Sequence, residues 1–150
     1  MNEATLGQRP AEILLVEDNA GDIRLTREAL SDGRISNRLH ITNDGVNALA
    51  FLRREGEFAD APRPDLILLD LNLPRMDGRE VLAEIKADRK LKNIPVVVLT
   101  TSHAEQDLLK AYSLHANCYI KKPVEFENFM EVIHSIKEFW LTIVVLPPRS

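Results

Sequence analysis

The sequence predicts an α/β protein with a doubly wound, five-stranded parallel sheet, and three observations carry this prediction. Five short apolar runs alternate with segments whose apolar residues recur at helical spacing, as in strand–helix–strand units. The runs at 13–16, 66–69 and 96–99 are apolar throughout, which is expected of strands that are covered on both faces. Right-handed crossovers and a length of 150 residues favour an open sheet over an eight-unit barrel.

Each expected strand is followed by an expected helix. The strands are Ile13 to Val16, Leu39 to Thr42, Leu66 to Leu69, Val96 to Leu99 and Cys118 to Ile120. The five helices are Ala20 to Asp32, a segment opened by Asp44-Gly45, a segment from Asp77 to about Lys90, Ala104 to Leu114, and a last segment with apolar positions from Phe126 to Trp140. Asn19 and Asp77 can cap the first and third helices. A polar linker, 55–64, precedes the third strand.

Composition indicates one globular domain, with 45% hydrophobic and 28% charged residues. The formal net charge of -4 gives no electrostatic basis for a general nucleic-acid partner. Cys118 is the only cysteine, so no internal disulfide can form, which fits a reducing compartment. No apolar run reaches membrane-spanning length, and residues 1–10 lack a signal peptide's apolar core. We therefore expect a cytoplasmic protein with no membrane partner, whose residues 1–10 form a flexible lead.

Polar side chains follow four of the predicted strands: Glu17 and Asp18, then Asp70, Thr100 and Lys122. The carboxyl ends of parallel strands share one edge, where ligands bind in open α/β sheets. Three crowded carboxylates without a nearby histidine or thiol predict a hard cation, Mg²⁺ or Mn²⁺. A carboxylate beside a cation, a hydroxyl and an ammonium group can accept a phosphoryl group as an acyl phosphate. Asp70 is the candidate acceptor.

Simpler interpretations stand beside these roles. Asp70 could be a turn aspartate, Lys122 a solvated surface lysine, and Tyr119 a half-buried strand aromatic. Thr100 is favoured over Thr101 because it directly follows the apolar run.

Four motifs make the chain similar to the receiver domains of two-component response regulators, from about Ala11 to Phe139. They are Leu-Leu-Val-Glu17-Asp18-Asn, Leu-Leu-Asp70-Leu-Asn-Leu-Pro74-Arg-Met-Asp77-Gly78, Val-Val-Val-Leu-Thr100-Thr-Ser102 and Tyr119-Ile-Lys-Lys122-Pro123. Each motif alone is a weak signal, whereas all four in this order at strand ends are highly specific. The resemblance implies a receiver domain over 11–139 with a flavodoxin-like sheet in the strand order 2-1-3-4-5.

The family implies that Asp70 accepts a phosphoryl group from a phosphohistidine of a sensor histidine kinase. It further implies that Mg²⁺ is held by Asp18, Asp70 and the backbone carbonyl of Asn72, with Glu17 acting through water.

The family also implies a conformational switch. Thr100 and Tyr119 would move as a pair and report phosphorylation on the surface between the fourth and fifth strands. The Lys122–Pro123 peptide bond is expected to be cis. One departure from the family is His115, where receivers usually carry a glycine after the fourth helix. Because histidine tolerates a left-handed helix stop less well, this exit is expected to be strained or differently shaped.

More narrowly, the chain resembles the single-domain regulators that are paired with cyanobacterial and bacterial phytochromes. The features are Val-Glu-Asp-Asn-Ala-Gly-Asp-Ile-Arg-Leu, Leu-Thr-Thr-Ser, Ala-Asn-Cys-Tyr-Ile and Glu-Phe-Trp-Leu-Thr-Ile-Val. This resemblance implies a phytochrome as the sensor kinase. It also implies that the C-terminal extension, 140–150, crosses to a second copy as the arm of a homodimer; the alternative is that it folds back over its own sheet.

The leading functional hypothesis is a phosphorylation-controlled signalling protein, not an enzyme beyond slow self-phosphorylation and dephosphorylation, with an unknown downstream protein partner. The alternative is a phosphatase or mutase that works through an aspartyl phosphate. Such enzymes need a second aspartate two residues after the nucleophile as general acid, and Asn72 occupies that position here. A third hypothesis is a flavin binder on the same fold, but Glu17 and Asp18 would repel its phosphate.

Overall fold

One parallel sheet organises the computed structural model, which describes residues 10–31, 36–101 and 118–135. Its strands lie in the order β2-β1-β3-β4-β5, and every neighbouring pair is parallel. The strands are β1 (Ala11–Val16), β2 (Asn37–Thr42), β3 (Leu66–Asp70), β4 (Val96–Thr100) and β5 (Cys118–Lys121). The predicted fold class and strand order are confirmed. β1 and β2 begin two residues earlier than predicted, and β3, β4 and β5 end one residue later, because backbone pairing continues beyond the apolar side chains.

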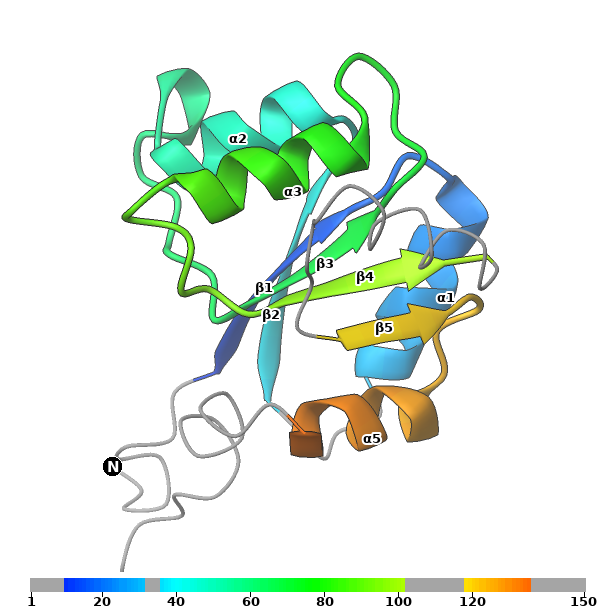
Figure 1. Ribbon diagram of the computed structural model, residues 1–150. Helices are drawn as coiled ribbons and strands as arrows, with labels where there is room; N and C mark the ends of the chain where they lie inside the picture. The colour runs from blue at the N-terminus through cyan, green and yellow to red at the C-terminus, as the bar shows by residue number, and fades with distance from the viewer. Residues whose placement is uncertain (1–9, 32–35, 102–117, 136–150) are drawn as a thin grey trace, which may run out of the picture.

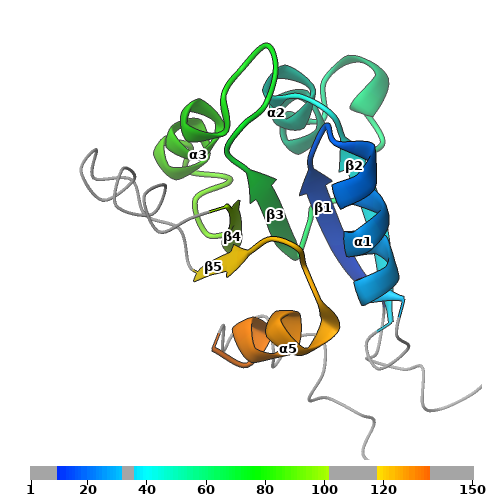
Figure 2. The ribbon, with the colours of Figure 1, turned by 90° about the vertical axis from the view of Figure 1, so that its right-hand side faces the viewer.

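Helices cover both faces of this sheet. Figures 1 and 2 show α2 and α3 together on one face, and α1 and α5 on the other. The described helices are α1 (Ala20–Leu30), α2 (Gly45–Arg53), α3 (Gly78–Ala87) and α5 (Phe126–Ser135). The helix expected over Ala104 to Leu114 lies outside the described residues, as do His115 and the continuation of the last helix to Trp140.

Three helices begin at side-chain caps that the sequence predicted or permitted. The side chain of Asn19 accepts a hydrogen bond from the backbone of α1 at 2.9 Å. Asp44 accepts one at the start of α2 at 2.7 Å. Asp77 forms a reciprocal capping box with Glu80 at the start of α3. Asp77 therefore acts as a helix cap, as expected.

Two helices end earlier than predicted. The first ends at Leu30 instead of Asp32, with Ser31 as its C-terminal cap. The third ends at Ala87 instead of Lys90, because Asp88 leaves the helical conformation with ψ at 119°. The Asp88 carboxylate then accepts a hydrogen bond from the backbone N–H of Lys90 at 2.8 Å, which favours a turn over another helical residue. The predicted linker also contains a short 3₁₀ turn, η2 (Gly56–Phe58).

The core consists of two apolar layers that the sheet separates. Alternate strand residues contribute to each layer, as the two-residue period of a strand requires. The layer under α1 and α5 includes Ile13, Leu15, Leu66, Leu68, Val97, Leu99, Ile120 and Phe129. The layer under α2 and α3 includes Leu14, Val16, Ile67, Leu69, Val96, Val98, Val81, Leu82 and Ile85. Because both faces are covered, β3 and β4 are buried along their whole length, which explains their unbroken apolar runs.

Within the described part of the chain, no helix combines the length and the apolar character needed to cross a membrane.

Candidate functional site

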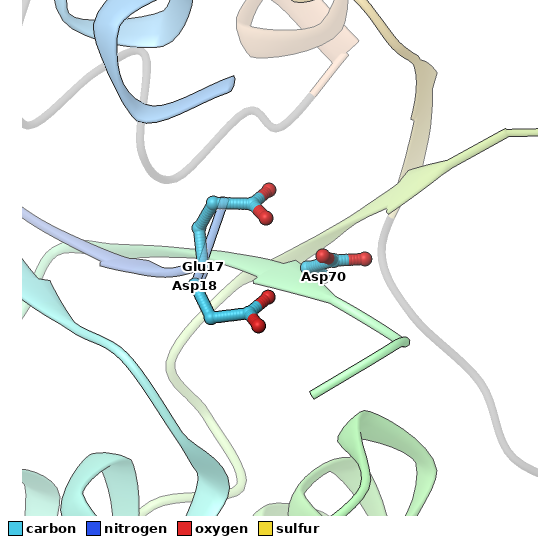
Figure 3. A group of neighbouring side chains, drawn as sticks. All are labelled: Glu17, Asp18 and Asp70. Carbon is cyan, nitrogen blue, oxygen red and sulfur yellow. The ribbon is translucent and has the colours of Figure 1, made fainter. Parts of the chain in front are cut away.

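Three carboxylates meet at the carboxyl edge of the sheet. Glu17 and Asp18 directly follow β1, and Asp70 is the last residue of β3. One oxygen from each side chain lies within 4.8 Å of the others (Figure 3). Glu17 and Asp70 are buried, with 1% and 3% of their surface exposed, whereas Asp18 is open to solvent. The sequence prediction that these three acids share one edge is confirmed.

Strand pairing and a tight turn fix the position of Asp70. Its backbone pairs with Leu99 at the end of β4. One carboxylate oxygen, Oδ1, accepts a hydrogen bond from the backbone N–H of Asn72 at 3.1 Å. The chain then returns to start α3 at Gly78, where a Cβ atom would overlap the backbone carbonyl oxygen of Asp70. Glycine is therefore required at position 78 by this close backbone approach.

Lys122 brings one positive charge into this acidic group. Its backbone N–H donates to the carbonyl of Thr100 at 2.8 Å, and its peptide bond to Pro123 is cis, as expected. The Lys122 ammonium lies 2.8 Å from Glu17 Oε1 and donates to Asp70 Oδ2 at 3.1 Å. The side chain is 13% exposed, so the interpretation of Lys122 as a solvated surface lysine is wrong.

Burial and the crowding of like charges change how these groups titrate. Burial raises the pKa of Glu17 to about 7, and the neighbouring Asp70 carboxylate adds to the effect while Lys122 opposes it. Burial alone would lower the pKa of Lys122, but its contacts with Glu17, Asp22 and Asp70 outweigh burial and raise that pKa. Lys122 is therefore a stable cation, whereas the raised pKa of Glu17 lets that side chain hold a proton up to about pH 7.

The acidic group fits a divalent cation. All donors are carboxylate oxygens, the ligands that hard cations prefer. One ammonium group, that of Lys122, faces the buried acids Glu17 and Asp70, and burial raises the pKa of Glu17. A divalent cation held by Glu17, Asp18 and Asp70 would supply the missing positive charge. Asn72 lies two residues beyond Asp70, and the role of its carbonyl as a ligand stays a prediction.

Thr100 ends β4 at the same edge. The residue is 1% exposed, and its hydroxyl oxygen is buried with no hydrogen-bond partner among the described residues. Thr101 is exposed, which supports the choice between these two threonines. Tyr119 is half-buried against the apolar layer under α2 and α3. The movement of Thr100 and Tyr119 as a pair stays a prediction.

Two further acids lie near this edge, and the sequence did not identify them as site residues. Asp22, in the first turn of α1, accepts a hydrogen bond from the Lys122 ammonium at 3.0 Å. Asp44 accepts one from Arg75 at 3.2 Å, which ties the loop after β3 to the start of α2. Arg75 itself has a positive φ of 64°. Neither contact has a local sequence signal, because each joins segments far apart in the chain.

The fold and the acidic edge define a class of protein that the comparisons identify directly. Residues 13–134 match the response regulator receiver domain, and the chain belongs to this family. The response regulator Rcp1 of Synechocystis sp. (strain ATCC 27184 / PCC 6803 / Kazusa) is 53% identical over 138 residues, which cover 92% of this chain and 94% of Rcp1.

Solved structures agree with this assignment. The bacteriophytochrome response regulator RtBRR is 42% identical with a TM-score of 0.82, covering 93% of this chain and 85% of its own. The phosphorylated cyanobacterial phytochrome response regulator RcpA is 54% identical with a TM-score of 0.73, covering 89% of this chain and 95% of its own. The Mn²⁺-bound form of Rcp1 is 52% identical with a TM-score of 0.72, and the match covers 93% of this chain and 100% of the Rcp1 chain.

Membership in this family makes the chain a signalling protein that works through phosphorylation of an aspartate. It does not favour the phosphatase alternative. The Mn²⁺-bound relative and the acidic group of this chain together support divalent-cation binding at the receiver site.

Proposed function

We propose that Asp70 accepts the phosphoryl group from a sensor histidine kinase. The observation that carries this proposal is the convergence of the Lys122 ammonium and three carboxylates on the end of β3. Asp70 is 3% exposed, and its two oxygens accept hydrogen bonds from different groups, the Asn72 N–H and the Lys122 ammonium. The carboxylate is therefore held in one orientation before a donor arrives.

The proposed reaction is an in-line transfer. A carboxylate oxygen of Asp70 forms a bond to phosphorus while the bond from phosphorus to the histidine nitrogen of the kinase breaks, and the electron pair stays on that nitrogen. Lys122 donates a charge-assisted hydrogen bond to the phosphoryl group. The buried hydroxyl of Thr100 becomes a donor to another phosphoryl oxygen. Glu17, Asp18, Asp70 and the carbonyl of Asn72 would hold Mg²⁺, which would supply positive charge that offsets the phosphoryl oxygens.

Mg²⁺ and a phytochrome kinase are the finer parts of this proposal. Coordination by oxygen atoms alone is typical of Mg²⁺ and Mn²⁺ alike, and cellular availability favours Mg²⁺. The match to regulators described as phytochrome and bacteriophytochrome response regulators supports a phytochrome as donor. The homodimer expected from 140–150 falls outside the described residues and stays a prediction, as do the unknown downstream protein and the slow self-phosphorylation.

Labelling with acetyl phosphate tests the acceptor. We expect Mg²⁺-dependent incorporation of one phosphoryl group into the protein, and its complete loss in Asp70→Asn. The matched control is Asp77→Asn, seven residues on in the same loop, because asparagine also caps helices well and should preserve α3. This control should keep the label. A label that persists in Asp70→Asn would show that another residue is the acceptor.

Competition between kinases tests the donor. Purified phytochrome kinase should transfer its phosphoryl group to this protein faster than unrelated histidine kinases at equal concentration. Equal rates from all kinases would contradict the phytochrome assignment without affecting the assignment of Asp70 as acceptor.

Truncation after Phe139 tests the predicted dimerisation arm. We expect the truncated protein to be a monomer by light scattering, and a dimer would show that 140–150 is not the main contact.

A further inference from the structure

The Lys122 ammonium has a third acidic partner that does not belong to the acidic group at the sheet edge. It donates to Asp22 Oδ2 at 3.0 Å, across a sequence separation of 100 residues. Asp22 is 32% exposed in its side chain and stands outside the group formed by Glu17, Asp18 and Asp70. Its own backbone N–H bonds to Asn19 at the start of α1, so the carboxylate is not needed for capping.

Strand alternation explains why these two residues meet. The apolar layer under α1 and α5 contains Leu66 and Leu68 of β3 and Ile120 of β5. The same two-residue period places Asp70 and Lys122 on that side of the sheet. The first turn of α1 covers this side immediately after the acids that follow β1. Asp22 therefore reaches Lys122 from the covering helix, while Asp70 reaches it from the sheet.

A lysine needs such a partner to be held in place. Its ammonium group is a point charge with three donors on a flexible stem of four carbons. In this structure the three acids Glu17, Asp22 and Asp70 surround it at 2.8, 3.0 and 3.1 Å. A cation at the sheet edge would be held by the group of Glu17, Asp18 and Asp70. Asp22, outside that group, is the contact that remains.

The geometry points to Asp22 as a positioning residue that holds the Lys122 ammonium beside Asp70 for the phosphoryl group. This inference rests on the proposed function of Asp70. Asp22 makes no contact with the reacting atoms and acts through Lys122. The competing explanation is that the Asp22 charge merely repels an anionic phosphodonor, in which case neutralising it would strengthen binding.

Two substitutions separate these explanations. Asp22→Asn keeps an oxygen that accepts from Lys122 but removes the charge, whereas Asp22→Ala removes both. The probe is the phosphoryl analogue beryllofluoride with Mg²⁺, measured by ¹⁹F NMR. If Asp22 positions the Lys122 ammonium, Asp22→Ala should weaken beryllofluoride binding about tenfold and Asp22→Asn less than about threefold. Mg²⁺ affinity without the analogue should change less than about twofold in both variants. Tighter binding in both variants, or wild-type binding in Asp22→Ala, would overturn the inference.

A double substitution tests whether Asp22 acts through Lys122. In a Lys122→Ala background, Asp22→Ala should cause no further loss, because the group that it positions is already gone. A full additional loss in that background would show that Asp22 acts by another route and would contradict the inference.

A control on the same helix and a test of the acceptor complete the design. Glu28→Gln removes the exposed pair with Arg24 in α1 and should leave beryllofluoride binding unchanged. Urea unfolding confirms that each variant is folded. Beryllofluoride binding by the wild-type protein and its absence in Asp70→Asn test the role of Asp70 as acceptor independently of Asp22. If those two results hold while Asp22→Ala behaves as wild type, only the positioning role is wrong.

Discussion

Two charged regions lie at opposite ends of α3 and differ in how deeply their charged side chains are buried. At the far end from Asp70, Arg53 pairs with Glu84 at 3.0 Å and lies 3.6 Å from Asp88. These side chains are between 24% and 49% exposed. At the sheet edge, Glu17 and Asp70 are almost fully buried, and one ammonium group serves three acids. The group around Arg53 is partly exposed to solvent, whereas the sheet edge gathers buried acids around one ammonium group.

This difference separates a structural charge network from a ligand site. Exposed pairs are screened by water and contribute little to stability, so they tolerate substitution. Buried like charges cost stability unless a partner neutralises them, and such strained groups concentrate at functional sites. The phosphoryl and cation site therefore lowers the stability of the empty protein, and its ligands should restore it.

The largest expected effect comes from the backbone that supports the buried edge. Gly78→Ala places a Cβ against the carbonyl of Asp70, and we expect a loss of about 3 kcal/mol in the free energy of unfolding. Beryllofluoride binding should be lost with it. Gly56→Ala is the control near the far end. Its φ of 58° costs about 1 kcal/mol, but nothing lies within 4 Å of the added carbon. Equal losses of unfolding free energy in Gly78→Ala and Gly56→Ala, measured with urea, would contradict the comparison of the two regions.

The next effect is the dependence of stability on pH. Because the folded pKa of Glu17 is raised from 4.5 to about 7, the folded state holds a proton that the unfolded state releases. Its contribution to stability is therefore complete below pH 4.5 and is lost as pH rises through about 7. In urea unfolding without metal, the wild type should lose roughly 2 kcal/mol relative to Glu17→Gln across this window. Added Mg²⁺ should reduce this loss. If the difference in free energy of unfolding between the wild type and Glu17→Gln stayed constant with pH, the raised pKa of Glu17 would be excluded.

A smaller effect tests the unpartnered hydroxyl at the site. Thr100→Val replaces a buried oxygen that has no partner among the described residues, so the empty protein should gain about 1 kcal/mol. The same change should weaken beryllofluoride binding. Thr42→Val is the matched control, because its hydroxyl is also buried without a described partner, at the end of β2. This control should gain stability without losing binding. Weakened binding in both variants would remove Thr100 from the site.

The smallest effect is expected at the far end of α3. Glu84→Gln breaks the exposed pair with Arg53 and should change the free energy of unfolding by less than about 0.5 kcal/mol. Acetyl phosphate labelling should be unchanged. A stability loss as large as that of Gly78→Ala would show that the two charged regions do not differ as described.

The strands and the acids at their ends were predictable because each depends on a local pattern. Unbroken apolar runs occur where both sheet faces are covered, and the polar residue that ends each run must lie at the edge. Asn19 and Asp77 were predictable as caps for the same reason, since a cap bonds within its own first turn. The resemblance to receivers added the predicted pairing of Thr100 with Tyr119, which no local pattern assigns.

The remaining features depend on contacts between distant segments. Asp22 follows the acids of β1 by only a few residues, yet its partner is Lys122, and only the docked α1 reveals the pair. The pair of Arg75 and Asp44 similarly joins two loops. The end of α3 was predicted too late because Asp88 is a weaker stop signal than glycine or proline. Phe58 in the supposed polar linker packs near Phe51, with ring centroids 5.5 Å apart, which only the fold could show.

Mapping the phosphorylated residue tests the central claim most directly. Reduction of the acetyl-phosphate-treated protein with borohydride converts an aspartyl phosphate to homoserine, which peptide sequencing then locates. The account predicts homoserine at position 70 alone, in a reaction that requires Mg²⁺. Homoserine at position 18 or 77 with Asp70 unmodified would contradict it.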